Sequence, residues 1–327
     1  MKNTTIPWTD YTFNPWIGCT KISPACQHCY AEIATPTRVA RAEGRELWGK
    51  GKPRQRTSAA TWKNPRKWNR EAVKNGTRPR VFCASLADWL DDEVPIEWLA
   101  DLLALIHATP NLDWLLLTKR PENWKISVQQ TMDQCDFGSA ETRYWVADWR
   151  NGKPPSNVWI GTTVENQKWA EERHVNLMAI PARVHFWSAE PLLSGIDARI
   201  LWAQHGKPSW VIAGGESGPQ ARPSHPDWFR SLRDQCVAAG VAFHFKQWGE
   251  WMVEIDRDND DPDWRADYTR SATGKFCILN LAGGSGFHGE RVYLMKRVGT
   301  KAAGRLLDGV EHNGFPQVSA YYNEKHL

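Results

Sequence analysis

The stretch Asn157–Pro191, NVWIGTTVENQKWAEERHVNLMAIPARVHFWSAEP, contains the pattern that decides the fold. Two apolar β-type runs, Asn157–Asn166 and Arg183–Pro191, each end in polar residues, and the segment Gln167–Met178 between them is helix-like. Near-continuous apolar strands that alternate with helices indicate a parallel sheet covered on both faces. The stretch therefore predicts one strand–helix–strand unit of such a sheet.

The same pattern recurs before and after this unit. Further strand-like runs are VFCAS (Val81–Ser85), DWLLLTKR (Asp113–Arg120), SWVIAGGES (Ser209–Ser217) and VAFHFKQWG (Val241–Gly249), and Tyr11–Trp16 could add one more. Helix-like segments are Ile96–Ala108 and Pro226–Ala239, the second with Ser224 and Asp227 near its start and Gly240 at its end. We expect a partial or full (β/α) barrel of about six to seven parallel strands. An open doubly wound sheet is the alternative.

Composition shifts divide the chain into four segments. We expect an N-terminal strand and cysteine loop over 1–36, a basic Trp-containing insertion over 37–80, the barrel core over 81–249 and a C-terminal extension over 250–327. In the extension, the GGSG sequence Gly283–Gly286 reads as a flexible turn and Lys301–Gly309 as a helix.

The overall composition is that of a globular protein. The 327 residues are 41% hydrophobic and 24% charged. The longest apolar run, Leu99–Ala108, contains Asp101 and His107, and MKNTTIPWTD at the start has no apolar core. We therefore expect no membrane span, no secretory signal and a cytoplasmic location. An odd count of seven cysteines in a reducing compartment points to metal ligands or redox centres rather than disulfides.

The positive charge is concentrated in one part of the chain. Thr37–Arg80 holds fourteen Lys and Arg residues, from Arg38 to Arg80, against three acids, while Asp256–Asp267 is acidic. Trp48, Trp62 and Trp68 lie among the basic residues. A basic segment with aromatics suits the phosphates and bases of a nucleic acid, and a solvated loop is the other interpretation.

Three of the seven cysteines lie within GCTKISPACQHCYAE, Gly18–Glu32: Cys19, Cys26 and Cys29. A structural zinc site wants four ligands, and the adjacent His28 could be the fourth. An iron–sulfur cluster on three thiolates would instead leave one iron open for a small molecule. The remaining cysteines, Cys83, Cys135, Cys236 and Cys277, stand singly and are expected to be free.

Polar residues follow every predicted strand. Since the carboxyl ends of parallel barrel strands meet at one rim, we expect a functional rim there. Its candidates are Ser85, Asp88, Thr118, Lys119, Arg120, Thr163, Glu165, Asn166, Ser188, Glu190, Gly215, Glu216, Ser217, Lys246 and Gln247. Lys246 could act as an acid or base, or simply form an ion pair with Glu216. Glu190 and Glu216 are further catalytic candidates.

The three-cysteine loop after an early strand, with a following parallel barrel, resembles the radical S-adenosylmethionine superfamily, although the first cysteine spacing is longer than in its CxxxCxxC pattern. The resemblance implies a [4Fe–4S] cluster on Cys19, Cys26 and Cys29, bound S-adenosylmethionine and a 5′-deoxyadenosyl radical. It places His28 at the aromatic position that flanks the cofactor, and Ser85 and Asp88 where cofactor contacts follow the first barrel strand. Further cofactor contacts would come from Thr118, Lys119, Arg120, Glu165, Glu190 and Glu216.

Six motifs in order resemble a phage and prophage family, the three-Cys-motif or phage gp thirty-seven/sixty-eight proteins. They are NPWIGCTKISPACQHCYAE, LLLTKRPENW, VWIGTTVENQ, FWSAEPLL, VIAGGESGPQARP and FKQWGEW. The phage context implies a nucleic acid or nucleotide substrate for a radical enzyme. Two alternatives remain: a metal-stapled nucleic-acid-binding protein without catalysis, and a metal-dependent nuclease that uses the rim carboxylates.

Overall fold

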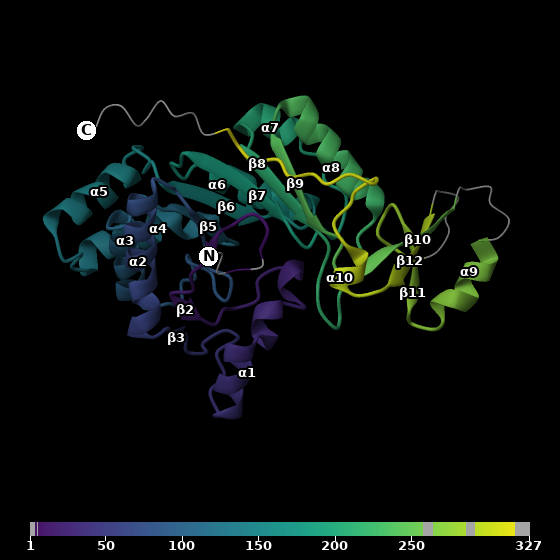
Figure 1. Ribbon diagram of the computed structural model, residues 1–327, viewed down its shortest axis with the longest axis horizontal. Coiled ribbons are helices and arrows are strands. Elements are labelled where there is room, and N and C mark those ends of the chain that lie inside the picture. The colour runs from purple at the N-terminus through teal and green to yellow at the C-terminus, as the bar shows by residue number, and fades with distance from the viewer. Residues whose placement is uncertain (1–3, 5, 258–263, 286–291, 318–327) are drawn as a thin grey trace. The chain divides into compact units, whose positions relative to one another are not determined.

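The structure is a computed structural model that describes residues 4, 6–257, 264–285 and 292–317 (Figure 1). The chain divides into two compact units. The first comprises Met1–Thr162, Val175–Phe186 and Gln317–Leu327, and the second comprises Thr163–His174 and Trp187–Pro316.

The central element is a seven-stranded sheet with the strand order β1-β4-β5-β6-β7-β8-β9. Its strands are β1 (Tyr11–Thr12), β4 (Arg80–Cys83), β5 (Asp113–Thr118), β6 (Val158–Thr163), β7 (Val184–Ala189), β8 (Trp210–Gly214) and β9 (Ala242–Gln247). The pairings β1·β4, β4·β5, β5·β6 and β8·β9 are all parallel. The expected α/β fold is confirmed as a partial barrel, and the short β1 is the additional strand predicted near the N-terminus.

Burial of the strands explains why the sequence runs are so apolar. Trp114, Leu115 and Leu116 of β5 have no exposed surface, and Ile160 of β6 is equally buried. A sheet covered on both faces selects apolar residues at successive positions rather than at alternate ones. In the first unit the helices α3 (Ile96–His107), α4 (Trp124–Gln134) and α5 (Ala140–Arg150) contact one another beside the sheet (Figure 1).

The predicted basic insertion folds as two helices and a short strand. These are α1 (Thr35–Ala42), β3 (Gln55–Arg56) and α2 (Ala59–Asn75). β3 pairs antiparallel with β2 (Trp16–Ile17), which leads into the cysteine loop. Ser58 caps α2 by accepting a hydrogen bond from the Thr61 amide, and Gly76 ends it with φ +60°.

α6 (Gln167–Met178) begins in the second unit, and α7 (Arg199–His205) and α8 (Pro226–Ala239) lie wholly within it. α8 starts near Ser224 and Asp227, as predicted, and its N-cap is His225, whose ring accepts a hydrogen bond from the Asp227 amide. Ser224 donates to the carbonyl of Leu192 at 2.7 Å. The C-cap at Gly240, with φ +64°, is as predicted.

The C-terminal segment forms its own small sheet in the second unit. β10 (Trp251–Arg257), β12 (Val292–Arg297) and β11 (Phe276–Asn280) are antiparallel, with α9 (Trp264–Ser271) against β11 (Figure 1). The helix expected over 301–309 is wrong in length: α10 covers Thr300–Ala303 and stops where Gly304 takes φ +72°. Part of the acidic segment and Gly286 of GGSG lie outside the described residues.

No helix within the described ranges is long and apolar enough to cross a membrane.

Candidate functional site

The cysteine loop begins directly after β2 and is clamped at its start. Gly18 has φ +112°, and a Cβ at this position would lie 2.4 Å from the carbonyl oxygen of Leu47. The Gly18 amide donates a hydrogen bond to the carbonyl oxygen of Leu86, and the backbone of Cys19 forms an isolated β-bridge with that of Trp48. Only glycine fits both the backbone conformation and the close approach. The loop then runs through two short 3₁₀ turns, Pro24–Cys26 and Tyr30–Ile33.

All three cysteines of the loop are free thiols, and cations of one strand end face them. Burial raises the pKa of Cys26, but the Lys119 ammonium and hydrogen bonds from Ile22 and Ser23 outweigh it and leave that pKa lowered. Burial raises the pKa of Cys29 and the same ammonium opposes it. Burial and the nearby Asp88 raise the pKa of Cys19 to about 12. The loop therefore carries its thiols in two settings: Cys26 and Cys29 lie near Lys119, and Cys19 lies beside Arg120.

The chemistry of these donors suits a thiolate-bound metal cluster, since three thiols lie on one short loop with cations nearby. Within the part of the chain that the structure describes, however, no group of three or more His, Cys, Asp or Glu side chains is arranged to hold a metal ion. The loop thus supplies suitable ligands without presenting a finished coordination shell.

Arg120 is the residue that ties the cysteine loop to the end of β5. Its guanidinium lies 3.6 Å from the sulfur of Cys19, and it donates to the Thr20 carbonyl at 2.8 Å. Asp88 accepts from the same guanidinium at 3.1 Å, and the side chains of both ionic partners are about 5% exposed. Burial lowers the pKa of Arg120, but Asp88 and Cys19 reverse this and raise it above its usual value.

Asp88 stabilises this arrangement through hydrogen bonds to both of its carboxylate oxygens. Its two carboxylate oxygens accept from the Thr118 hydroxyl at 2.6 Å and the Lys119 amide at 2.8 Å. The structure thus brings the predicted site residues Cys19, Asp88, Thr118 and Arg120 together in the first unit. In the arrangement seen, Asp88 and Thr118 orient Lys119 and Arg120.

A second buried arginine holds the other side of the loop. Arg54, whose side chain is completely buried, donates to Asp91 at 2.8 Å and to the Thr20 hydroxyl at 2.8 Å. Thr20 in turn donates to Glu93 at 2.5 Å. Thr20 therefore receives contacts from both Arg54 and Arg120. Sequence reasoning missed Arg54 and Thr20, although Thr20 directly follows Cys19.

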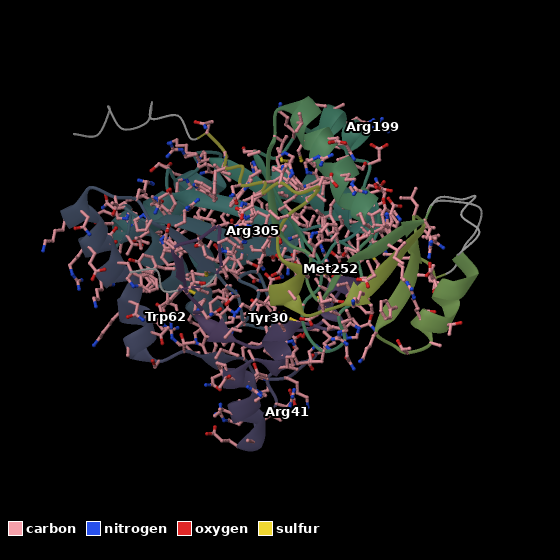
Figure 2. All side chains as sticks on the ribbon, turned by 45° about the vertical axis from the view of Figure 1, so that its right-hand side comes forward. Tyr30, Arg41, Trp62, Arg199, Met252 and Arg305 are labelled. Carbon is pink, nitrogen blue, oxygen red and sulfur yellow. The ribbon has the colours of Figure 1, made fainter. Side chains whose placement is uncertain are left out.

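Ser85, another predicted cofactor contact, is joined to the last cysteine by a tyrosine. The Tyr30 hydroxyl donates to the Ser85 carbonyl at 2.7 Å, while 52% of Tyr30 stays exposed (Figure 2). The Ser85 hydroxyl accepts from Asn14 at 3.0 Å. His28 is half-buried on the same loop. Tyr30 was not predicted, yet its position immediately after Cys29 is a signal that could have identified it.

In the second unit, two of the predicted catalytic residues form an ion pair. Lys246 of β9 donates to Glu190, which follows β7, at 2.6 Å, and both side chains are about one-fifth exposed. The side-chain amide of Gln247 donates hydrogen bonds to the Glu190 carboxylate at 3.2 Å and to the Ser217 hydroxyl at 2.7 Å. The partner of Lys246 is therefore Glu190 and not Glu216, whose carboxylate is bound by Arg222.

Glu216 is bound by a different cation. Its carboxylate accepts from the amide and the side chain of Arg222, with distances of 2.5–2.8 Å. The glycine before Glu216 serves close packing of the backbone. A Cβ on Gly215 would lie 1.9 Å from the carbonyl oxygen of Trp248, and one on Gly249 would lie 2.2 Å from that of Glu216. Gly215 and Gly249 are thus explained by the close contact of their two backbone segments.

Glu165 is the most deeply buried of the predicted carboxylates. It has no exposed surface and accepts from Arg173 of α6 at 2.8 Å. The guanidinium of Arg173 also lies 4.1 Å from the centre of the Trp169 ring. A buried and paired carboxylate of this kind serves first to fix α6 on its strand.

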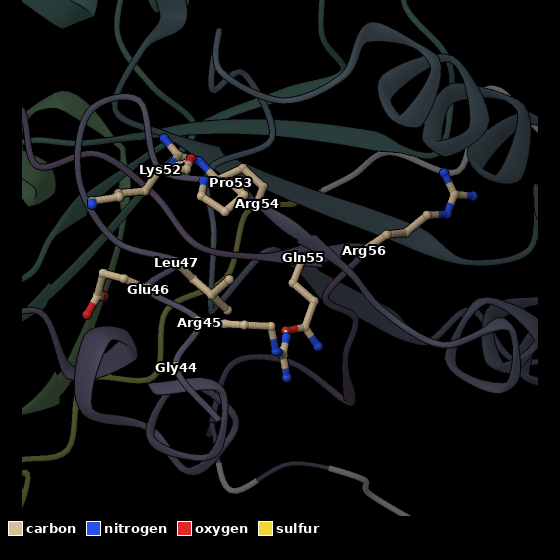
Figure 3. Close-up of a pocket in the computed structure, with 9 residues that line it drawn as sticks. All are labelled: Gly44, Arg45, Glu46, Leu47, Lys52, Pro53, Arg54, Gln55 and Arg56. Atoms are coloured by element: carbon tan, nitrogen blue, oxygen red, sulfur yellow. Dashed lines mark hydrogen bonds between the residues drawn. The ribbon is translucent and has the colours of Figure 1, made fainter. Parts of the chain in front are cut away.

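One pocket of about 580 Å³ lies on the first unit between α1 and β3. Figure 3 shows its lining, which runs over Gly44–Leu47 and Lys52–Arg56, with Arg45 and Gln55 hydrogen-bonded to each other. No cysteine is among the lining residues. The pocket is therefore separate from the thiols.

Comparison with solved structures finds chains of spore photoproduct lyase. One with bound AdoMet and dinucleoside spore photoproduct is 11% identical, with a TM-score of 0.41 over 90% of this chain and 71% of that chain. A cysteine-to-serine mutant of the lyase is 13% identical, with a TM-score of 0.42 over the same shares. The lyase complexed with dinucleoside spore photoproduct is 12% identical, with a TM-score of 0.38 and the same coverage. Likeness at this level does not transfer a substrate, a cofactor or a mechanism to this chain.

No curated protein matches the sequence. One family model, described as "Protein of unknown function (DUF5131)", matches residues 3–316. Because the match spans nearly the whole chain, this protein belongs to the DUF5131 family of proteins of unknown function.

Proposed function

We propose that the protein is an iron–sulfur enzyme of the radical S-adenosylmethionine type, with a [4Fe–4S] cluster on Cys19, Cys26 and Cys29. The observation that carries the proposal is the placement of Lys119 and Arg120 at the end of β5 beside these thiols. Positive neighbours favour the thiolate, which is the form that binds metal, and at Cys26 they outweigh the effect of burial and leave the pKa lowered. Three thiols without a second cysteine pair fit an open cluster better than a closed zinc site.

The chain's own residues would take the following roles. With S-adenosylmethionine bound, such a cluster supplies a 5′-deoxyadenosyl radical by reductive cleavage. Arg120 holds Cys19 and Thr20 in position, and Lys119 would pair with the carboxylate of the cofactor. Tyr30 presents an exposed aromatic ring beside Cys29.

The remaining candidates lie in the second unit. Lys246 and Glu190 are candidates for proton transfer, because a paired ammonium and carboxylate can exchange a proton. Glu165 and Glu216 stay candidates for the polar groups of the cofactor. To take that role, Glu165 would first have to break its ion pair with Arg173, and Glu216 its ion pair with Arg222.

Anaerobic reconstitution tests the proposal. Wild-type protein should hold about four irons per chain, show a band that dithionite bleaches, and release 5′-deoxyadenosine from S-adenosylmethionine. Cys19→Ala, Cys26→Ala and Cys29→Ala should each lose the band and the product. Cys135→Ala is the matched control, because Cys135 is a partly exposed free cysteine outside the loop, and it should retain both.

Three outcomes would reject the proposal. Stoichiometric zinc without iron would assign a structural metal site to the loop. Iron retained after all three loop cysteines are replaced would place the metal elsewhere. Nucleic acid cleavage that needs Mg²⁺ but no iron would favour the nuclease.

The biological setting follows from the same proposal. A phage or prophage origin and a cytoplasmic location are consistent with the resemblance of the six motifs and with an oxygen-sensitive cluster. In that setting we expect a nucleic acid or nucleotide substrate, and the basic segment is the part of the chain expected to contact a nucleic acid.

A further inference from the structure

The fold neutralises part of the basic segment and leaves part of it uncompensated. Six of the seven arginines of Thr37–Arg80 that lie outside α2 pair with acids: Arg41 with Glu46, Arg45 with Glu43, Arg54 with Asp91, Arg56 with Asp101, Arg78 with Asp113 and Arg80 with Asp10. These residues mainly hold the first unit together. Five of the eight remaining cations of Thr37–Arg80 lie on one helix, and the other three are Arg38, Lys50 and Lys52.

α2 carries that charge on its exposed side. Lys63, Arg66, Lys67, Arg70 and Lys74 are all exposed, and their spacing of three or four residues places them along one side of the helix. The single acid of α2 is Glu71, 3.9 Å from Lys67, and such exposed pairs are weak. The row spans about 16 Å, over which one strand of duplex DNA presents about five phosphates.

We propose that this row, Lys63, Arg66, Lys67, Arg70 and Lys74, contacts the phosphate backbone of a nucleic acid. The proposal deepens the proposed function by naming the substrate class, and it rests on that function only for the reaction. The same chemistry would serve DNA and RNA, because both present phosphodiesters.

The buried side of α2 argues against a membrane as the partner. Pro65, Trp68 and Ala72 face the protein core, and Trp68 stacks on Tyr11 with ring centres 4.3 Å apart. A helix that binds a lipid surface must insert its apolar side into the membrane. Here that side is already packed against the protein, the cations lie on the exposed side, and Val73 is a single large apolar residue that the helix exposes.

The tryptophans of the segment take part in packing rather than in reading bases. Trp48 and Trp68 are each 7% exposed, and the Trp62 ring is covered by Arg56 at 4.1 Å. Contacts through phosphates alone carry no direct sequence information. The binding is therefore of a backbone type, strongly dependent on salt and weakly dependent on sequence.

The test compares two variants that lose the same charge. One carries Lys63→Gln, Arg66→Gln, Lys67→Gln, Arg70→Gln and Lys74→Gln, since glutamine keeps good helix propensity. The control carries glutamine at five exposed basic positions elsewhere: Lys125, Arg143, Arg150, Lys153 and Arg199. Binding of a labelled DNA duplex and of a single-stranded RNA is measured by anisotropy over a range of salt, and circular dichroism checks folding.

The α2 variant should bind at least about tenfold more weakly at low salt, and its slope of log K against log salt should fall by about 3–5. The control should keep most of the wild-type slope. The probe that the wild-type protein binds more tightly identifies the kind of nucleic acid.

Equal losses in both variants, or wild-type binding by the α2 variant, would overturn the proposal. Tighter binding to phosphatidylserine vesicles than to either nucleic acid, lost in the α2 variant, would reassign the row to a membrane. Because the row does not involve the thiols, binding without iron would uphold this inference while the enzyme proposal fails. A working cluster without nucleic acid binding would do the reverse.

Discussion

The guanidinium of Arg120 contacts the sulfur of Cys19 across 101 positions of the sequence, at 3.6 Å. The same group is held by Asp88 at 3.1 Å. The pair thus connects the first cysteine of the loop to the last residues of a barrel strand. It also means that the properties of the thiol depend on a residue far away in the chain.

Arg120→Gln should destabilise the protein strongly. The substitution leaves the buried carboxylate of Asp88 without its cation, which typically costs about 3–5 kcal/mol. Urea denaturation of the metal-free protein measures the loss. Lys153→Gln is the control, because the Lys153–Asp148 pair is exposed and its loss should cost less than about 1 kcal/mol. Similar losses in the two variants would show that the Arg120–Asp88 pair adds nothing to stability.

If the loop holds the proposed cluster, Arg120→Lys should leave a folded protein in which the properties of that cluster are altered. Lysine keeps the charge beside Asp88 but cannot reach Cys19, Asp88 and Thr20 together, since it lacks the planar fork of donors. Hydrogen bonds to cysteine sulfur raise the reduction potential of iron–sulfur clusters. A more negative midpoint potential is therefore expected in a redox titration followed by electron paramagnetic resonance. A potential equal to that of the wild type would mean that the contact does not tune the cluster.

Gly215→Ala should cost about 2–4 kcal/mol in the free energy of unfolding, because the new methyl group would meet the carbonyl oxygen of Trp248 at 1.9 Å. Backbone cannot move aside as a side chain can. Gly284→Ala serves as the control, since its nearest neighbour is the side chain amide of Asn280 at 3.2 Å, and it should change stability by under about 1 kcal/mol. Thermal melts of both variants provide the comparison, and equal melting points would contradict the close contact.

Lys246→Gln and Glu190→Gln distinguish a structural pair from a catalytic one. Because both side chains are partly exposed, their coupling energy in a double-mutant cycle should be under about 1 kcal/mol. If the pair transfers protons, turnover should nevertheless fall by about 10²–10⁴. Product formation by the reconstituted enzyme is the readout. Turnover within a few-fold of the wild type in both variants would leave the pair a structural role only.

The sheet could be predicted from the sequence because its burial is nearly continuous. Residues such as Trp114, Leu115 and Leu116 need no partner information to be recognised as an inner strand. The predicted runs therefore match the observed strands to within a few residues. The helix expected over 301–309 was predicted too long for a local reason: the helix stops at Gly304, whose φ is positive.

The pairing of the charged residues could not be predicted in the same way. Strand-end carboxylates all look alike in the sequence, but Glu165 is buried against Arg173, Glu216 is held by Arg222 and only Glu190 meets Lys246. Which acid meets which base depends on strand order and on side chains from helices that follow much later. The closeness of Cys19, Cys26 and Cys29 in the sequence, by contrast, needs no knowledge of strand order, because all three lie on one short loop, and their role as cluster ligands stays a prediction.

The contact between Cys19 and Arg120 has a consequence for biosynthesis. At about 5–20 residues per second, the ribosome needs roughly 5–20 s to deliver the arginine after the first thiol has been made. During that interval the first thiol is without the arginine that later contacts it. The contact therefore forms well after the loop has been made, and an iron donor that acted earlier on the proposed cluster site would meet a loop that this arginine does not yet hold.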